Sequence, residues 1–287
     1  MTHIHSPLPA QRGEGSGEGG AQHTLARAFS VRGTALHAGG ECGVEVRPAP
    51  PDAGRVFVVG GVRVPAALGN VVDTRLATTL GVGDTRVRMV EHLCAALFAE
   101  GVDNVEIEVE GGEVPVLDGS ARLWTAAIRN AGLAPQGAPR RVVAIAEPVR
   151  VEVDGAWAML LPAARFELDV AVDFTHPRIG AQRWIGAVGD FSRELAWART
   201  FGFFRDAHAL WASGLARGAS LENTVVYDEA GVMNPDGLRA ADEAVRHKAL
   251  DAIGDAALLG AEIRGRLVVH RAGHGVHRRL WEAVAGA

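Results

Sequence analysis

Three side chains of one stretch, His247, Asp251 and Asp255, are spaced four residues apart in a segment with helical periodicity. In an α-helix, residues four apart lie on one face, one turn above another, so an imidazole and a carboxylate spaced this way can reach one metal ion. A solvated helix face with an i,i+4 pair is the more common cause of such spacing. The spacing alone therefore leaves a metal site and an ordinary ion pair both open.

The dipeptide Glu91-His92, at the start of an earlier helical stretch, is a second candidate. A ligand from here would complete the three-ligand arrangement of a catalytic zinc, with the adjacent glutamate as a base. The pair also fits an acid at a helix N-terminus beside an unrelated imidazole. Because the spacing is not that of a His-Glu-x-x-His motif, it gives no independent support for a metal site.

Three histidines, His270, His274 and His277, gather near the C-terminus. Glycines flank His274 on both sides and permit an unusual backbone there, so this imidazole can approach a substrate closely. The alternative is a histidine of a surface loop.

The elements that must position these residues follow from periodicity and turn residues. The first half predicts, in order, strands over 43–47 and within 56–64, a helix over 90–100, a strand over 105–109 and a helix from Asp118 or Ser120 to about Asn130. The second half predicts strands at 149–153, 157–161 and 166–174, helices near 192–199 and 206–216, a strand at 224–228, a long helix over 239–259, a strand at 267–270 and a terminal helix. Both halves are therefore of the α+β class.

Composition divides the chain into three parts. Residues 1–22 include GEGSGEGG and are too polar and glycine-rich to bury a core, so we expect a disordered leader. Residues 131–140 contain two prolines and two glycines and indicate a linker. The sequence thus predicts an N-terminal α+β domain over 23–135 and a C-terminal α+β domain over 136–287.

The charge and cysteine content exclude several classes of protein. A net charge of −5 argues against nucleic-acid binding, and no apolar run is long enough to span a bilayer. Since the N-terminus does not have the pattern of a signal peptide, we expect a cytoplasmic protein. Cys42 and Cys94 lack metal-pair spacing, so histidines and carboxylates must hold any metal. The chain is rich in arginine and keeps its single lysine at Lys248, beside His247.

Several ordered segments together resemble one family, the UDP-3-O-acyl-N-acetylglucosamine deacetylases of lipid A biosynthesis. The matching segments are GTALHAGG at 33–40, MVEHLCAAL at 89–97, GVDNVEIEVEGGEVPVLDGSA at 101–121, ARTFGFFRD at 198–206, NPDGLR at 234–239, VRHKALDAIGD at 245–255 and AGHGVH at 272–277. The resemblance implies two domains of similar layered sheet-and-helix architecture, each with a small insert, and an active site at the domain interface. It also implies zinc-dependent hydrolysis of the acetamide of an acylated UDP-sugar, a small-molecule substrate, and we expect a monomer.

The resemblance assigns roles residue by residue. It implies that His92, His247 and Asp251 bind Zn²⁺ and that Glu91 is the base that deprotonates water. His274, held by Asp255, would be the acid that protonates the leaving amine, and Thr200 would help to hold the oxyanion.

The same resemblance places Lys248 and Phe201 beside the substrate, with Phe174 and Arg271 as candidates for binding the UDP group. An insert of the second half would form an apolar passage for the acyl chain, for which the stretch 201–215 is a candidate. That stretch, with Phe203, Phe204, Leu210 and Trp211, fits an amphipathic core helix equally well.

The sequence departs from the family pattern at Thr34, Ala35, Ala146 and Ala219. These departures keep open a diverged enzyme that deacetylates another sugar nucleotide. A non-catalytic binding module on the same scaffold is the alternative from a different class.

Overall fold

The computed structural model describes residues 20–286, so most of the predicted leader lies outside the described residues. The leader prediction is wrong for its last two residues, because Ala21 and Gln22 belong to strand β1 (Ala21–Leu25). Gln22 is buried, and its amide nitrogen donates hydrogen bonds to Asp52 and to the carbonyl of Pro139. These bonds hold β1 against the loop at Asp52 and against β10.

The first sheet has five strands in the order β2-β3-β9-β4-β5. They are β2 (Phe29–Thr34), β3 (Glu41–Pro48), β9 (Val105–Glu110), β4 (Arg55–Val59) and β5 (Val62–Pro65). In β9, valine and isoleucine alternate with glutamate, and only the aliphatic side chains are fully buried. This alternation directs one face of the sheet toward the core.

The second sheet has the path β12-β13-β19-β14-β15, with β11 paired to β19 as a sixth strand. Its strands are β11 (Val142–Ala144), β12 (Val149–Val153), β13 (Ala156–Leu161), β14 (Phe166–Asp173), β15 (Ala181–Ala187) and β19 (Glu262–His270). Along β19, every second residue from Ile263 to Val269 is buried. The strand predicted over 267–270 is therefore only the end of a longer one.

The two sheets share one topology. In each, the third strand along the path pairs antiparallel with the second and parallel with the fourth. In each half a helix precedes that central strand and another follows it: α1 (Glu91–Ala99) and α2 (Arg122–Ala131) in the first half, α5 (Glu243–Ala256) and α6 (His274–Ala285) in the second. This repetition confirms the predicted α+β class and its similar layered halves.

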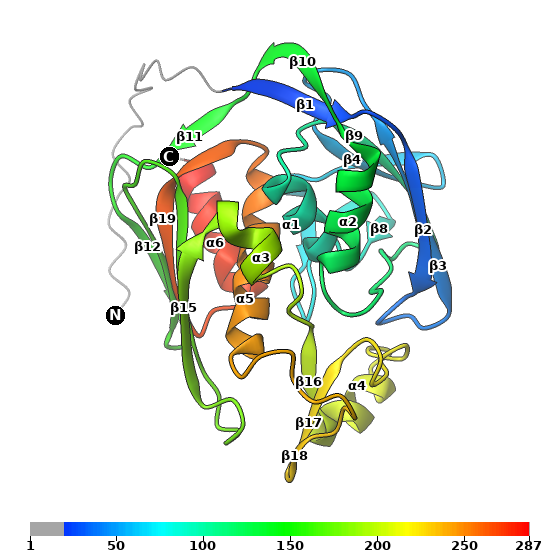
Figure 1. Cartoon of the computed structure of the whole chain (residues 1–287), viewed down its shortest axis with the longest axis vertical. Coiled ribbons are helices and arrows are strands. Elements are labelled where there is room, and N and C mark those ends of the chain that lie inside the picture. Colours follow the sequence, from blue (N-terminus) through cyan, green and yellow to red (C-terminus); the bar gives the residue numbers. More distant parts are fainter. Residues whose placement is uncertain (1–19, 287) are drawn as a thin grey trace.

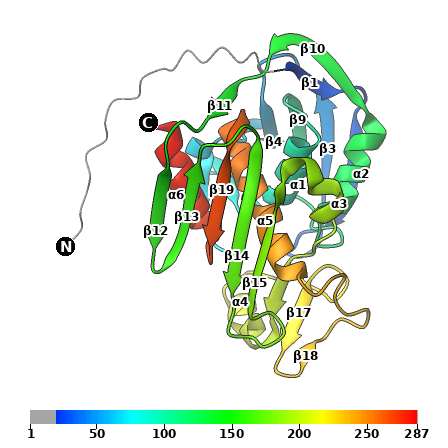
Figure 2. The ribbon, with the colours of Figure 1, turned by 60° about the vertical axis from the view of Figure 1, so that its left-hand side comes forward.

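The helices lie between the two sheets (Figures 1 and 2). The helices α1 and α5 pack directly on each other at the centre. Gly254 makes this close crossing possible, because a Cβ atom there would lie 2.3 Å from the carbonyl oxygen of Glu91. Most residues of α5 are buried, including His247, Asp251 and Asp255.

Each half also carries a small three-stranded sheet between its fifth strand and its central helix. The first comprises β6 (Val71–Asp73), β7 (Thr79–Val82) and β8 (Thr85–Val87), preceded by a short 3₁₀ turn at Leu68–Asn70. The second comprises β16 (Phe201–Phe203), β17 (Val225–Asp228) and β18 (Gly231–Val232), together with the helix α4 (Ala207–Ala212), and extends from the lower end of the molecule in Figure 1.

The stretch predicted as a linker is mostly a strand, β10 (Leu133–Pro139), which pairs antiparallel with β1. Its two prolines and its glycine suggested a loop, but a two-stranded ribbon has free edges where a residue without an N–H is tolerated. Because β10 crosses the boundary predicted at 135/136, the division into domains at that point stays a prediction.

Two helices of the second half are shorter than their sequence patterns predicted. The helix expected near 192–199 is α3 (Phe191–Glu194), and the helix expected over 206–216 is α4, after the 3₁₀ turn Phe204–Asp206. Gly214, with φ of +77°, lies in a conformation that a helix cannot continue, so the second pattern ends early.

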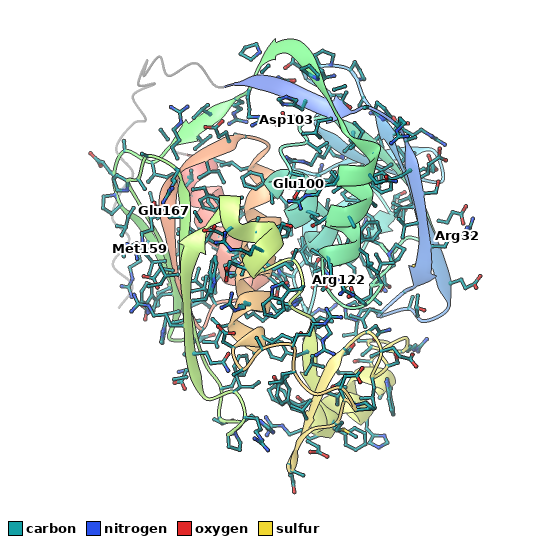
Figure 3. The ribbon with its side chains drawn as sticks, in the orientation of Figure 1. Arg32, Glu100, Asp103, Arg122, Met159 and Glu167 are labelled. Atoms are coloured by element: carbon teal, nitrogen blue, oxygen red, sulfur yellow. The ribbon has the colours of Figure 1, made fainter. Side chains whose placement is uncertain are left out.

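Charged side chains cover the outer faces of the two sheets. Arg32 on β2 and Glu167 on β14 lie on opposite flanks of the molecule (Figure 3). Within residues 20–286, we find no helix with both the length and the apolar character needed to cross a bilayer.

Candidate metal centre and active site

Three side chains from two helices converge between the two halves. His92 comes from the first turn of α1, and His247 and Asp251 come from successive turns of α5. One potential ligand atom from each lies within 4.8 Å of the others, and all three residues are buried. Nε2 of His92 and Nε2 of His247 lie 3.8 and 3.4 Å from Oδ1 of Asp251. The structure thus brings together the three residues expected to bind metal.

The hydrogen bonds around these residues suit a divalent cation. Nδ1 of His247 lies 3.1 Å from the carbonyl oxygen of Ala198 and must donate to it, which leaves Nε2 as the free lone pair. Oδ1 of Asp251 is buried without a hydrogen-bond partner among the described residues. Two nitrogen ligands and one carboxylate oxygen form the protein-ligand set of a catalytic zinc, so the residues fit such an ion.

The electrostatic surroundings of these residues favour the protonation states that bind a metal ion, a neutral imidazole and an ionised carboxylate. Burial, followed by the neighbouring His247, lowers the pKa of His92 to about 3, so its imidazole is neutral. Burial alone would raise the pKa of Asp251, but His247 and Lys248 hold that pKa below its usual range. Lys248 reaches Asp251 directly, with Nζ 2.8 Å from Oδ2.

Glu91 precedes the first histidine and is itself buried. Its Oε2 accepts a hydrogen bond of 3.0 Å from the backbone N–H of Thr78. Burial raises the pKa of Glu91 to about 7, although the nearby His274 opposes the rise. A carboxylate with a pKa near neutrality is able to take up and release a proton at physiological pH.

His274 stands across the same site at the start of α6. Its Nδ1 lies 2.8 Å from Oδ2 of Asp255, and its Nε2 lies 4.0 Å from Oδ2 of Asp251. Burial opposes its protonation, but the charge and hydrogen bond of Asp255 outweigh burial and raise the pKa of His274 to about 9. The site therefore combines a group that accepts protons near neutrality with a group that is protonated there.

Thr200 also faces this site, on the segment that leads into β16. Its N–H donates a hydrogen bond of 2.7 Å to the carbonyl of Gly119, in the DGS turn of the first half. Gly119 has φ of +81°, and a Cβ atom there would lie 2.0 Å from the carbonyl oxygen of Asn223. Only glycine permits this close approach, which fixes Thr200 against the other half of the molecule.

A cavity of about 1230 Å³ opens beside these residues. All four residues predicted to bind substrate line it, namely Lys248, Phe201, Phe174 and Arg271. The rings of Phe174 and Phe201 meet edge to face with centroids 5.5 Å apart, and Nζ of Lys248 lies 5.6 Å from the centroid of Phe201. The cavity thus has an aromatic wall and cationic groups along its lining.

The sequence pattern of the stretch 201–215 left open an apolar passage and an amphipathic core helix, and the structure contradicts the second. Phe203 and Leu210 line the cavity. Phe204 and Trp211 are 51% and 46% exposed, so no core covers them. This segment is therefore not an amphipathic core helix, and part of it forms an apolar wall of the cavity.

Two hydrogen-bonding groups near the site include residues, Thr78 and Glu113, that the sequence analysis did not identify. Thr78 links Glu91 to Asp255, and Nδ1 of His277 lies 2.8 Å from the same Asp255 oxygen as His274. His37 lines the cavity. The backbone N–H of His37 donates a hydrogen bond to Oε1 of Glu113. His277 was visible as a neighbour of His274 in sequence, whereas no pattern distinguishes Thr78 or Glu113.

Residues 34–37, at the end of β2 and in the turn after it, include two departures from the family pattern and pack on the loop that contains Gly218. A Cβ atom on Gly218 would lie 2.2 Å from the carbonyl oxygen of Ala35, so these two backbones touch. The backbone N–H of Gly218 donates to the carbonyl of Leu36. His37 therefore stays at the cavity despite Thr34 and Ala35.

Comparison with known proteins agrees with this geometry. The family described as UDP-3-O-acyl N-acetylglycosamine deacetylase (LpxC) matches residues 22–286. The UDP-3-O-acyl-N-acetylglucosamine deacetylase of Myxococcus xanthus (strain DK1622) is 46% identical over 265 residues, which cover 90% of this chain and 84% of that protein. The protein of the same name from Anaeromyxobacter dehalogenans (strain 2CP-C) is 44% identical over 267 residues, covering 92% and 87%. The chain belongs to the UDP-3-O-acyl N-acetylglycosamine deacetylase family.

Proposed function

We propose that this protein is a zinc-dependent amidohydrolase that removes the acetyl group of UDP-3-O-acyl-N-acetylglucosamine, a step of lipid A biosynthesis. The observation that carries the proposal is the convergence of His92, His247 and Asp251 beside Glu91 and His274. The family membership and the names of the relatives support the same substrate.

His92, His247 and Asp251 would hold the ion. When bound, zinc acts as a Lewis acid toward the acetamide carbonyl and lowers the pKa of water at the site to about 7. Oδ1 of Asp251, which is buried and has no partner among the described residues, supports this assignment. A neutral His92 does so as well, since only the unprotonated nitrogen donates a lone pair.

Glu91 would take the proton of the attacking water. The hydrogen bond from the N–H of Thr78 fixes one of its oxygens, so the carboxylate is oriented before substrate arrives. As the water oxygen bonds to the acetyl carbon, the O–H electrons remain on oxygen and the proton passes to Glu91.

His274 would give its proton to the leaving nitrogen. An amide anion is a poor leaving group, so the C–N bond breaks only as that nitrogen gains a proton, giving a free amine and acetate. The raised pKa of about 9 keeps His274 protonated near neutrality. Asp255 would fix the orientation of its ring.

Thr200 would donate a hydrogen bond to the oxyanion that forms on the acetyl carbonyl. A single well-placed donor of this kind contributes about 3 to 4 kcal/mol in comparable sites. Lys248 and Phe201 would contact the substrate beside the metal, with Phe174 and Arg271 toward the UDP group. Phe203 and Leu210 would border the acyl chain.

Acetate release from purified, zinc-loaded protein tests the proposal. We expect turnover of UDP-3-O-acyl-N-acetylglucosamine and far less turnover of the analogue without the acyl chain. Equal turnover of both would favour the diverged enzyme, and no release from either would favour a binding module. Elemental analysis of the purified protein tests the metal, and less than one equivalent of divalent metal would count against a resident ion.

A further inference from the structure

Thr78 connects the two groups proposed to exchange protons with the substrate. It lies just before β7, is 1% exposed and does not line the main cavity. Its backbone N–H donates to Oε2 of Glu91 at 3.0 Å, and its Oγ1 donates to Oδ1 of Asp255 at 2.6 Å. The same Oγ1 lies 3.2 Å from Nδ1 of His274. One residue therefore contacts the base directly, and it contacts the acid both directly and through the carboxylate of Asp255.

The proton positions in this network follow from the chemistry of the groups. An ionised Asp255 only accepts, so the Thr78 hydroxyl must direct its proton to Oδ1. The lone pairs of Oγ1 and of Asp255 Oδ2 then both face Nδ1 of His274, which must carry a proton. This arrangement leaves Nε2 of His274 on the side of Asp251 and the cavity.

Asp255 is held from three directions. Thr78 binds one oxygen, and the Nδ1 atoms of His274 and His277 each lie 2.8 Å from the other. The two imidazoles share a single oxygen, so neither ring binds the other oxygen of the carboxylate. The Thr78 hydroxyl binds this second oxygen, so it holds the carboxylate on the side that the imidazoles do not reach.

We propose that Thr78 is a positioning residue of the reaction: its hydroxyl sets the Asp255 carboxylate, and through it the ring of His274, while its N–H holds Glu91. The proposal rests on the function proposed above and deepens it. Thr78 acts through its neighbours and contacts neither the cavity nor the metal ligands.

The substitution Thr78→Val tests the hydroxyl, since valine keeps the shape and the backbone N–H but cannot donate to Asp255. We expect kcat to fall by about 10- to 100-fold, the range for residues that orient catalytic groups, with KM and zinc content nearly unchanged. Thr78→Ser should restore most of kcat. Thr79→Val is the matched control, because Thr79 is the adjacent buried threonine and its side chain takes part in none of these bonds, and it should keep the parental kcat. If Thr78→Val is unstable, the pair Thr78→Ser and Thr78→Ala makes the same comparison.

The same substitution in a His274→Ala protein distinguishes an effect on the position of His274 from a general loss of stability. If Thr78 acts through His274, Thr78→Val should cost little further kcat in a His274→Ala protein. An equal loss of kcat in both backgrounds, or parental kcat in Thr78→Val, would overturn the proposal.

Crystal structures of zinc-free Thr78→Val and Thr79→Val give a readout independent of turnover. We expect a rotated Asp255 carboxylate and a displaced His274 ring in the first variant alone. If the Asp255 carboxylate and the His274 ring keep their positions in Thr78→Val, the positioning role of Thr78 is refuted, even if the parent protein deacetylates the substrate. If the parent protein releases no acetate but Asp255 and His274 are displaced in Thr78→Val, the proposed function is wrong, whereas the positioning role of Thr78 is supported.

Discussion

Glu91 and His274 are buried in one site, yet their surroundings move their proton affinities in useful directions. Burial destabilises the charge of Glu91, whereas Asp255 stabilises the charge of His274 against the same burial. From the sequence alone, Glu91 also fits an acid at a helix N-terminus, and His274 also fits a histidine of a surface loop. Only their spatial surroundings distinguish a base from an acid.

Replacement of Glu91 by glutamine tests the base at this scale. Glutamine keeps the size and one carbonyl oxygen to accept the N–H of Thr78, but it cannot take a proton. We expect kcat to fall by about 100-fold or more, since general-base catalysis contributes about 100- to 10,000-fold, with zinc content unchanged. Turnover and metal content measured on the same preparation check this, and full activity in the variant would contradict the role.

The pH dependence of turnover follows from the same two groups. Glu91 must be ionised, so activity should rise as pH increases through its pKa of about 7, and His274 must be protonated, so activity should fall as pH passes its pKa of about 9. We expect a bell-shaped profile for the parent protein. His274→Ala should be slower and lack the descending limb, and a variant that kept that limb would remove His274 as its source.

Residue types near the site were predictable in part. The i,i+4 pattern indicated that His247 and Asp251 share a helix face, and the structure agrees. No spacing could bring His92 to them, because that contact depends on how α1 packs against α5. Thr78 and Glu113 were not predictable for a related reason: their importance lies in hydrogen bonds across 177 and 76 residues of chain.

At the scale of elements, the crossing of α1 and α5 sets the distance between Glu91 and the residues of α5. A glycine inside a helix usually lowers the stability of that helix by about 1 kcal/mol relative to alanine. Helix propensity therefore does not explain a glycine at position 254. The contact with the Glu91 carbonyl explains it.

Gly254→Ala should therefore destabilise the protein even though alanine favours helices. The added methyl group would force the two backbones apart, and overpacking of this kind costs about 1 to 3 kcal/mol. Thermal unfolding should show a lower Tm, and kcat should fall because Glu91 moves. Gly189→Ala is the control, since no atom lies within 4 Å of its added Cβ. A Tm of Gly254→Ala at or above that of the parent would show that α1 and α5 accommodate the added methyl group without loss of stability.

Elements with strong periodicity were predictable, and elements defined by their partners were not. The helix α1 and the strands β9 and β12 match their sequence patterns closely. The strand β10 was missed because its prolines and glycine indicate a loop, and its strand conformation depends on pairing with β1, more than a hundred residues away.

At the scale of the whole molecule, neither half contains a complete site. Glu91 and His92 come from the first half, and His247, Asp251 and His274 come from the second. The repeated topology was expected only from the family resemblance, because the two halves share an order of strands rather than a sequence motif.

Expression as two polypeptides tests this division of labour. A cut between Arg140 and Arg141 leaves β1 and β10 together in one fragment. The second fragment would retain two of the three metal ligands, so it should bind zinc far more weakly than the whole chain, and neither fragment should release acetate. Mixing the two should restore both properties. Tight zinc binding by the second fragment alone would show that His92 is dispensable.

The two small sheets leave the scaffold at equivalent points, each between a fifth strand and a central helix. In both halves, then, the additional strands enter at the same junction and form a sheet separate from the five- or six-stranded one. Residues of both inserts border the cavity or the network behind it, among them Phe203 and Thr78. A protein built this way can acquire a new ligand preference by remodelling the second insert, whereas the first insert, which carries Thr78, must be inherited together with the groups that break the bond.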